Sequence, residues 1–230
     1  MLLLGIDTSG KTASAALYDS NKEMFLAQTS VYTKMTHSQV ILPLCNDILE
    51  KANVEYNDID EIAVAVGPGS YTGLRIGVSA VKALAFGLNC KCCGVSTLEA
   101  MAYSNIGYRG NICSIMSARN DLVYTALYKS NGYSIEKIND EQIISETELA
   151  EIIAFNSAET LLCGDDCAAF FEKYQSDMLH LAPPHLRLQT AAGICLAATC
   201  KDAVNPHEIE ASYLQKVKAE KDLENKLKNA

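Results

Sequence analysis

The chain has 230 residues, 49% apolar and 20% charged, which is enough to bury the core of one α/β domain or of two small ones. Its 28 acidic and 19 basic residues give a formal net charge of −9. We therefore expect no surface that holds nucleic acid unaided, because phosphate neutralisation needs clustered Lys and Arg. No apolar run approaches the roughly 20 residues of a membrane span, and no basic region precedes the leucines of the opening MLLLGIDTS. These features predict a cytoplasmic protein without membrane contact.

In the first hundred residues, apolar runs predict strands and 3.6-residue periodicity predicts helices. The predicted elements are strands at 2–7, 12–19 and 23–31, a helix from 36 or 37 to 53, a strand at 62–66, a helix at 72–88, a strand at 92–95 and a helix at 97–101. The strand at 62–66 is apolar on both faces, as parallel strands are.

The second half repeats this order of elements. Predicted strands lie at 111–119, 122–130 and 133–140, followed by a helix at 146–155, a strand at 160–164 and helices near 168–174 and 190–203. Three strands, a helix, a strand and a helix thus occur twice, which indicates two related subdomains. We expect an N-terminal subdomain at 1–103, a C-terminal one at 104–215 and a terminal helix or tail at 216–230.

Nine cysteines are present, an odd number. The spacing of Cys163 and Cys167 suits zinc, but no second cysteine pair lies near a histidine. The pattern favours buried, reduced thiols and predicts no metal site.

A glycine-rich turn within AVAVGPGSYTGLRIG, residues 63–77, separates a predicted strand from a predicted helix, a place where phosphates often bind. The lysine of the Walker motif is missing after Gly73. A dinucleotide site needs an acidic residue after the next strand, and no Asp or Glu occurs between Glu61 and Glu99. A phosphate role for this loop is therefore disfavoured.

The glycines have a second use in helix packing. Gly69, Gly73 and Gly77 recur every four residues, and Val81 continues the same ridge. Each interior glycine costs about 0.5–1 kcal/mol relative to alanine, so the ridge indicates that another element approaches closely. That element is either the core of the same chain or a helix of a partner subunit, and the residues alone leave both open.

Six segments carry a family resemblance. They are GIDTSGKTASAAL at 5–17, HSQVILP at 37–43, AVAVGPGSYTGLRIGVSAVKAL at 63–84, GVSTLEAMA at 94–102, SARNDLVYTALY at 117–128 and SYLQKVKAE at 212–220. With these segments in this order, the chain resembles the TsaB (YeaZ) family of bacterial tRNA threonylcarbamoyladenosine biosynthesis proteins. The resemblance spans nearly the whole chain and is strongest through residue 130.

The resemblance implies an actin-like ATPase fold (ASKHA, ribonuclease H-like) with two subdomains, each a mixed sheet flanked by helices. It also implies a non-catalytic subunit that binds and activates the catalytic paralogue TsaD, alongside the small ATPase TsaE. The modified base is the adenosine next to the anticodon in tRNAs that read ANN codons, and tRNA is met only through the complex. In isolation the chain is expected to form a homodimer that mimics the heterodimer.

No catalytic residue is expected. The catalytic paralogue carries an HxxxH metal pair after the glycine-loop helix, and the corresponding stretch 96–101 has no histidine. The candidate first phosphate hairpin contains Asp7, Thr8, Ser9 and Lys11. The second, at 111–123, lacks the glycines that let a backbone approach a phosphate, and Arg119 within it is expected to form a structural ion pair. We expect no tightly bound cofactor, with ATP or ADP limited to a complex interface.

The resemblance places the partner contact on the two helices that begin near residues 37 and 72. The expected interface residues are Val40, Ile41, Leu44, Ile48, Gly69, Gly73, Gly77 and Val81. Tyr71, Thr72 and Arg75 at the mouth of the loop are candidates for contacting a partner or a nucleotide. The competing hypothesis is an enzyme, either an actin-like kinase, which only Asp7 favours, or a metallopeptidase-like enzyme, which the missing histidine pair disfavours.

Overall fold

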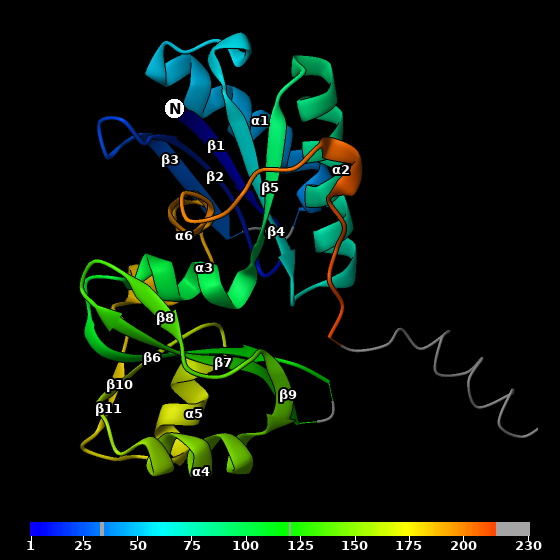
Figure 1. Ribbon diagram of the computed structural model, residues 1–230. Helices are drawn as coiled ribbons and strands as arrows, with labels where there is room; N and C mark the ends of the chain where they lie inside the picture. The colour runs from blue at the N-terminus through cyan, green and yellow to red at the C-terminus, as the bar shows by residue number, and fades with distance from the viewer. Residues whose placement is uncertain (33–34, 120, 215–230) are drawn as a thin grey trace, which may run out of the picture.

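The structure is a computed structural model that describes residues 1–32, 35–119 and 121–214. It consists of two mixed sheets, one above the other in Figure 1, with helices on the faces of each. The predicted terminal helix or tail at 216–230 lies outside the described residues.

The first sheet has the strand order β3-β2-β1-β4-β5. Its strands are β1 (Leu2–Asp7), β2 (Thr12–Asp19), β3 (Met24–Tyr32), β4 (Glu61–Gly67) and β5 (Lys91–Ser96). β1, β2 and β3 form an antiparallel meander, and β4 and β5 run parallel to β1. The loops after β1 and β4 therefore leave the same edge of the sheet, side by side.

Helices cover both faces of this sheet. The helices α1 (His37–Ala52) and α2 (Tyr71–Leu88) pack on one face with Leu4 and Ile6 of β1. The helices α3 (Thr97–Ser104) and α6 (Ala191–Ala198) pack on the other face with Leu3. Alternate residues of β1 thus belong to two different cores, as the two-residue period of a strand requires.

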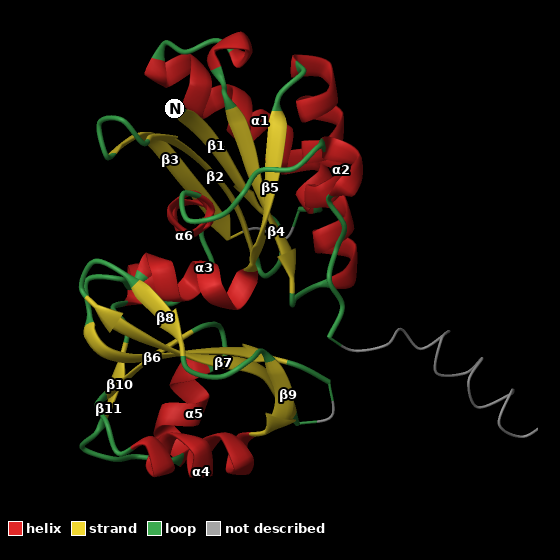
Figure 2. Cartoon of the chain, in the orientation of Figure 1, coloured by secondary structure: helices red, strands yellow, loops and turns green. Residues whose placement is uncertain are grey.

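The second sheet has the order β11-β10-β6-β7-β8, and β9 also pairs with β7. Its elements are β6 (Arg109–Ser117), β7 (Leu122–Asn131), β8 (Ile135–Lys137), β9 (Gln142–Ser145), α4 (Glu146–Asn156), β10 (Thr160–Cys163), α5 (Cys167–Lys173) and β11 (Leu179–Leu181). α4 and α5 cover one face, and α3 contributes Leu98 and Met101 to the core on the other. α3 is therefore shared between the two halves (Figure 2).

The chain returns to the first sheet at its end. α6 packs on β1, β2 and α3, after a 3-10 turn at Pro184–Leu186. Residues 204–214, here called the terminal strap, then pair with β5 through Val204 and Cys92 and run past the 3-10 turn Pro206–Glu208 along α2 (Figure 1). The predicted division at residue 104 stays a prediction, and the last elements of the chain lie against the first sheet.

Most predicted elements of the first half are confirmed within two residues, including α1 and α2. The long third strand predicted at 133–140 is wrong, because β8 spans only Ile135–Lys137 and a separate strand, β9, follows it. The last predicted helix ends at Ala198 rather than at 203.

Candidate functional site

The loop after β1 is built around a buried carboxyl group. Asp7 Oδ1 accepts hydrogen bonds from the Ser9 backbone N–H at 2.8 Å and from the Ser9 hydroxyl at 2.6 Å. Oδ2 has no hydrogen-bond partner among the described residues. Burial raises the pKa of Asp7 to about 6, against the lowering effect of the Ser9 hydrogen bonds and of nearby His37. Asp7 therefore stabilises its own turn and is closed off from the cleft.

The glycine ridge of α2 faces this same loop. A Cβ on Gly77 would lie 2.5 Å from Thr8 Oγ1, and one on Gly73 would overlap the Thr8 carbonyl oxygen. The Thr8 hydroxyl in turn donates to the carbonyl oxygen of Gly73 at 2.7 Å. Gly69 lies equally close to the backbone of Ser9. The ridge lets α2 approach the end of β1 within the chain.

This arrangement corrects part of the predicted partner surface. Ile41, Ile48 and Val81 are at most 2% exposed and belong to the core between α1, α2 and the first sheet. Gly73 and Gly77 are buried as well, so none of these five residues offers contact area to a partner. The physical reason is that small residues at helical spacing are equally suited to a strand end and to a foreign helix. Val40, Leu44 and Gly69 are half-buried.

The loop after β4 begins α2 at the rim of a cleft between the two halves. Gly67 has a φ of +129° and is packed against the Ser212 backbone, which excludes a side chain there. Ser70 caps α2 by accepting the Gly73 N–H at 3.2 Å. The first turn of α2 contains no acidic residue, so Tyr71 and Thr72 stand exposed at a helix N-terminus that favours negative charge.

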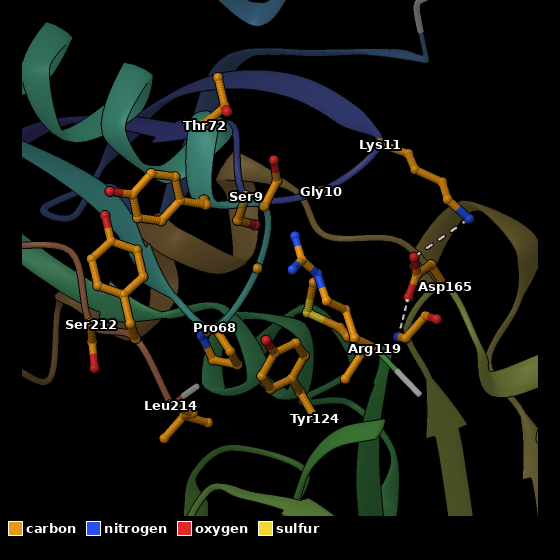
Figure 3. Close-up of a pocket in the computed structure, with 17 residues that line it drawn as sticks. Ser9, Gly10, Lys11, Pro68, Thr72, Arg119, Tyr124, Asp165, Ser212 and Leu214 are labelled. Carbon is orange, nitrogen blue, oxygen red and sulfur yellow. Dashed lines mark hydrogen bonds and ion pairs between the residues drawn. The ribbon is translucent and has the colours of Figure 1, made fainter. Parts of the chain in front are cut away.

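The cleft between the halves has a volume of about 680 Å³. Lys11 reaches across it and forms an ion pair with Asp165 at 3.5 Å, and Asp165 also accepts the Ser117 N–H at 3.1 Å (Figure 3). The Asp165 side chain is only 12% exposed. Lys11, the single lysine of the first hairpin, thus has its charge matched from the second half.

The second hairpin brings Arg119 and Tyr124 into the cleft. Arg119 points toward Ser9 and Gly10 (Figure 3) and has no ion-pair partner among the described residues, so the predicted structural ion pair is wrong. No residue of this hairpin is a glycine, and the hairpin is described except at residue 120. A phosphate would therefore meet side chains here rather than an open backbone.

Gln189 is the buried polar residue that sequence reasoning missed. Its amide group packs directly on Gly10 and has no hydrogen-bond partner among the described residues, while its backbone carbonyl accepts the Thr12 hydroxyl at 2.9 Å. Gln189 fills the space beside the one glycine of the first hairpin. Its distance of 179 positions along the chain from Gly10 leaves no local signal for the contact.

Outside the cleft, a groove of about 550 Å³ separates the start of α1 from the outer side of α2. Its lining residues are Ser38, Tyr71, Thr72, Arg75, Ile76, Ser79 and Ala80. Farther along the same two helices, Leu42 is 41% exposed and Phe86 is 84% exposed. The three predicted contact residues at the mouth of the loop, Tyr71, Thr72 and Arg75, all line this groove, and Tyr71 and Thr72 also border the cleft.

The cysteines and the remaining acidic residues form no metal centre in the part of the chain that the structure describes. All nine cysteines are free thiols, and seven of them are buried. Burial raises the pKa of Cys113 and Cys163 to about 12, so these thiols stay protonated. No helix of the described ranges has the length and hydropathy of a membrane span.

Comparison with known proteins agrees with this geometry. The family model of tRNA N6-adenosine threonylcarbamoyltransferase, TsaD, matches residues 31–228. The TsaB protein of Bacillus subtilis is 34% identical over 166 residues, which are 72% of each chain. That of Escherichia coli is 32% identical over 154 residues, 65% of this chain and 64% of the relative. A Symbiobacterium thermophilum tRNA N6-adenosine threonylcarbamoyltransferase is 31% identical over 145 residues, 54% of this chain and 42% of the relative.

Among solved structures, YeaZ from Pseudomonas aeruginosa has a TM-score of 0.77 at 25% identity and covers 93% of this chain and 99% of its own. The Acidaminococcus fermentans (R)-2-hydroxyglutaryl-CoA dehydratase component A matches at a TM-score of 0.51 and 12% identity, over 86% of this chain and 96% of its own, and shares the fold alone. The two mixed sheets with a cleft between them define an actin-like ATPase fold. Within that class, the chain belongs to the TsaB (YeaZ) family of tRNA threonylcarbamoyladenosine biosynthesis proteins.

Proposed function

We propose that this chain is a non-catalytic subunit that binds and activates the catalytic paralogue TsaD. The substrate of the complex is the adenosine next to the anticodon in tRNAs that read ANN codons. The observation that carries the proposal is that residues of the first hairpin make their contacts with other residues of the same chain. Asp7 hydrogen-bonds its own turn, Lys11 is paired with Asp165, and Gln189 covers Gly10. The first hairpin is therefore engaged by contacts within the chain.

The surface proposed for TsaD is the outer α2 face together with the neighbouring part of α1. The outer α2 face consists of Thr72, Arg75, Ile76, Ser79, Ala80, Ala83 and Phe86, which recur at three- and four-residue spacing. These side chains are small or apolar apart from Arg75, and an exposed apolar stripe of this kind is typical of helix–helix association. The same surface, in a second copy, would support a homodimer of the isolated chain.

Activation is proposed to occur by population shift. A rigid subunit that packs on helices of TsaD can favour its catalytically competent conformation only if it binds that conformation more tightly than the others. This mechanism requires that the chain bind the conformations of TsaD with different affinities, and it requires no catalytic group from the chain. TsaE is proposed to join the same complex, and tRNA to contact it through TsaD.

A second candidate function has one observation in its favour. The cleft is large enough for a nucleotide, and Lys11, Arg119 and the α2 N-terminus all border it. We propose that any ATP or ADP held here binds weakly, at a complex interface. An actin-like kinase or a metallopeptidase-like enzyme is the alternative. Saturable nucleotide binding with phosphoryl transfer by the isolated chain would favour the kinase.

Size-exclusion chromatography with light scattering tests the main proposal, for this chain alone and mixed with TsaD from the same organism. The variant is Ala83→Arg, which places a long cation at an exposed position of the outer α2 face. We expect a heterodimer with the wild type and at least a tenfold weaker one with the variant, about 1.4 kcal/mol. Ala169→Arg, at an exposed position of α5 on the other half, is the matched control. If Ala83→Arg forms the heterodimer with TsaD as readily as the wild type does, the proposed surface is contradicted. If the wild type forms no heterodimer with TsaD, the proposed function is contradicted.

A further inference from the structure

A three-residue cluster forms where the terminal strap meets the start of α2. The strap is held along its length by backbone hydrogen bonds. Val204 exchanges two with Cys92, at 2.8 and 3.0 Å, and the Ser212 N–H donates to the Val66 carbonyl oxygen at 2.7 Å. Between these points the Lys82 ammonium donates to the His207 carbonyl oxygen at 3.2 Å. The strap therefore delivers Tyr213 to a defined position beside α2.

Tyr213 and Tyr71 together orient the side chain of Arg75. The Arg75 Nε–H donates to the Tyr213 hydroxyl at 3.3 Å, and the guanidinium carbon lies 4.2 Å from the centre of the Tyr71 ring. The two tyrosine rings contact each other, with centroids 5.0 Å apart and planes at 35°. Arg75 is thus held by one hydrogen bond and one cation–π contact.

The outward end of this guanidinium is not engaged. The described residues provide no further partner for it beyond Tyr213 and Tyr71. Both terminal NH₂ groups therefore keep their donors, arranged as the planar fork that matches a carboxylate. Arg75 also forms the rim of the groove whose floor includes Ile76 and Ala80.

We infer that Arg75 is the charged anchor of the TsaD interface and that it receives a carboxylate from a partner helix whose apolar side chain enters the adjoining groove. This inference rests on the proposed function and names the partner chemistry that the surface selects. Local charge supports it, because Arg75 is a fixed cation on a helix, α2, that contains no acidic residue to neutralise it. Orientation by Tyr71 and Tyr213 lowers the entropy that Arg75 loses on binding.

The same charges disfavour a second copy of this chain as the occupant. α2 carries Arg75 and Lys82 and no acidic residue, and the first turn of α1 has none either. Where two copies bring these helix starts together, Arg75 meets no carboxylate and like charges face each other. Arg75 thereby favours the heterodimer over the homodimer, because the repulsion between like charges acts only when a second copy of this chain is the partner.

A nucleic acid is the less suitable occupant of this cluster. Phosphate neutralisation needs several clustered cations, and Arg75 is the one cation that lines this groove in the described structure. The Tyr71 ring, which a base would stack on, is already in contact with Arg75 and Tyr213.

Isothermal titration calorimetry with TsaD at low and high ionic strength tests the inference, using wild type, Arg75→Met and Tyr213→Phe. Arg75→Met should weaken Kd about tenfold and remove most of the salt dependence, while the homodimer stays equal or strengthens. Tyr213→Phe keeps the ring but loses the hydroxyl, and should weaken Kd about threefold. Arg109→Met, an exposed arginine on β6, is the matched control and should change neither value.

The outcomes separate the inference from the proposed function. If the wild type does not bind TsaD, the proposed function fails. If the wild type binds and Arg75→Met binds equally well with the same salt dependence, the interface stands and the anchor is wrong. Fluorescence anisotropy with labelled tRNA completes the test, since tRNA binding by the isolated chain that is lost in Arg75→Met would also overturn the carboxylate assignment. An unchanged thermal midpoint of each variant excludes misfolding as the cause of weaker binding.

Discussion

The two sides of α2 use similar residues for opposite purposes. On the inner side, Gly73 and Gly77 let the helix touch the backbone and hydroxyl of Thr8. On the outer side, Ser79, Ala80 and Ala83 leave a shallow apolar surface open to solvent. Small residues at four-residue spacing therefore indicate close approach without saying from which side it comes. The inner contacts hold the start of α2 against the loop after β1, and the outer surface is the one we propose for TsaD.

The largest expected effect is a loss of stability on substitution of a glycine on the inner side of α2. Gly77→Leu should destabilise the chain by about 3 kcal/mol or more, because its Cβ alone would lie 2.5 Å from Thr8 Oγ1. Chemical denaturation measures this. Gly87→Ala is the control in the same helix. It meets nothing within 4 Å and should stabilise the chain by up to about 1 kcal/mol. Equal stability of Gly77→Leu and wild type would mean that the ridge is open, as a partner groove would be.

The buried carboxyl group at the end of β1 gives the next largest effect. Folding raises the pKa of Asp7 from 3.8 to about 6, so the unfolded chain ionises first and the stability contributed by the protonated form is lost as pH rises through this interval. The full loss amounts to about 3 kcal/mol. Asp7→Asn should therefore flatten the dependence between about pH 4 and pH 7 and be the more stable form at neutral pH. Urea unfolding across this range provides the measurement, and identical pH profiles would show that Asp7 is ionised in the fold.

The smallest effect concerns the contact across the cleft. Lys11→Met removes the ion pair with Asp165, and the lysine side chain is 58% exposed. Solvent screening limits the expected loss of stability to about 0.5 kcal/mol, and that loss should disappear at high salt. Asp165→Asn should cost more, because it also weakens the acceptor of the Ser117 N–H. The reverse order of the two variants would show that Lys11 is the more constrained partner.

How much of the fold could be predicted from the sequence depends on how far apart along the chain the contacting residues lie. α1 and α2 could be predicted because their apolar period and caps are local, and β4 because it is apolar on both faces. The short strands β9 and β11 could not, since each is set by pairing with a distant neighbour. Which element the glycine ridge contacts could not be decided from the sequence for the same reason, because Thr8 lies 65 positions before Gly73.

Residues of the candidate site could be predicted from the sequence, but the partners that they contact could not. Asp7, Lys11 and Arg75 were recognised as candidate residues from their motifs. Asp165, the partner of Lys11, and Tyr213, the partner of Arg75, come from other parts of the chain, brought near by parallel strand order and by the terminal strap. A carboxylate after a predicted strand end, as at Asp165, is the one signal that sequence offered for such a contact.

The most direct test of the central claim is photo-crosslinking from the outer α2 face. A benzoylphenylalanine introduced in place of Ala83, compared with one in place of Ala169 on α5, reports which surface touches TsaD in the assembled complex. We expect a covalent adduct with TsaD from position 83 and none from position 169. An adduct from position 169 alone would contradict the assignment of the outer α2 face as the partner surface.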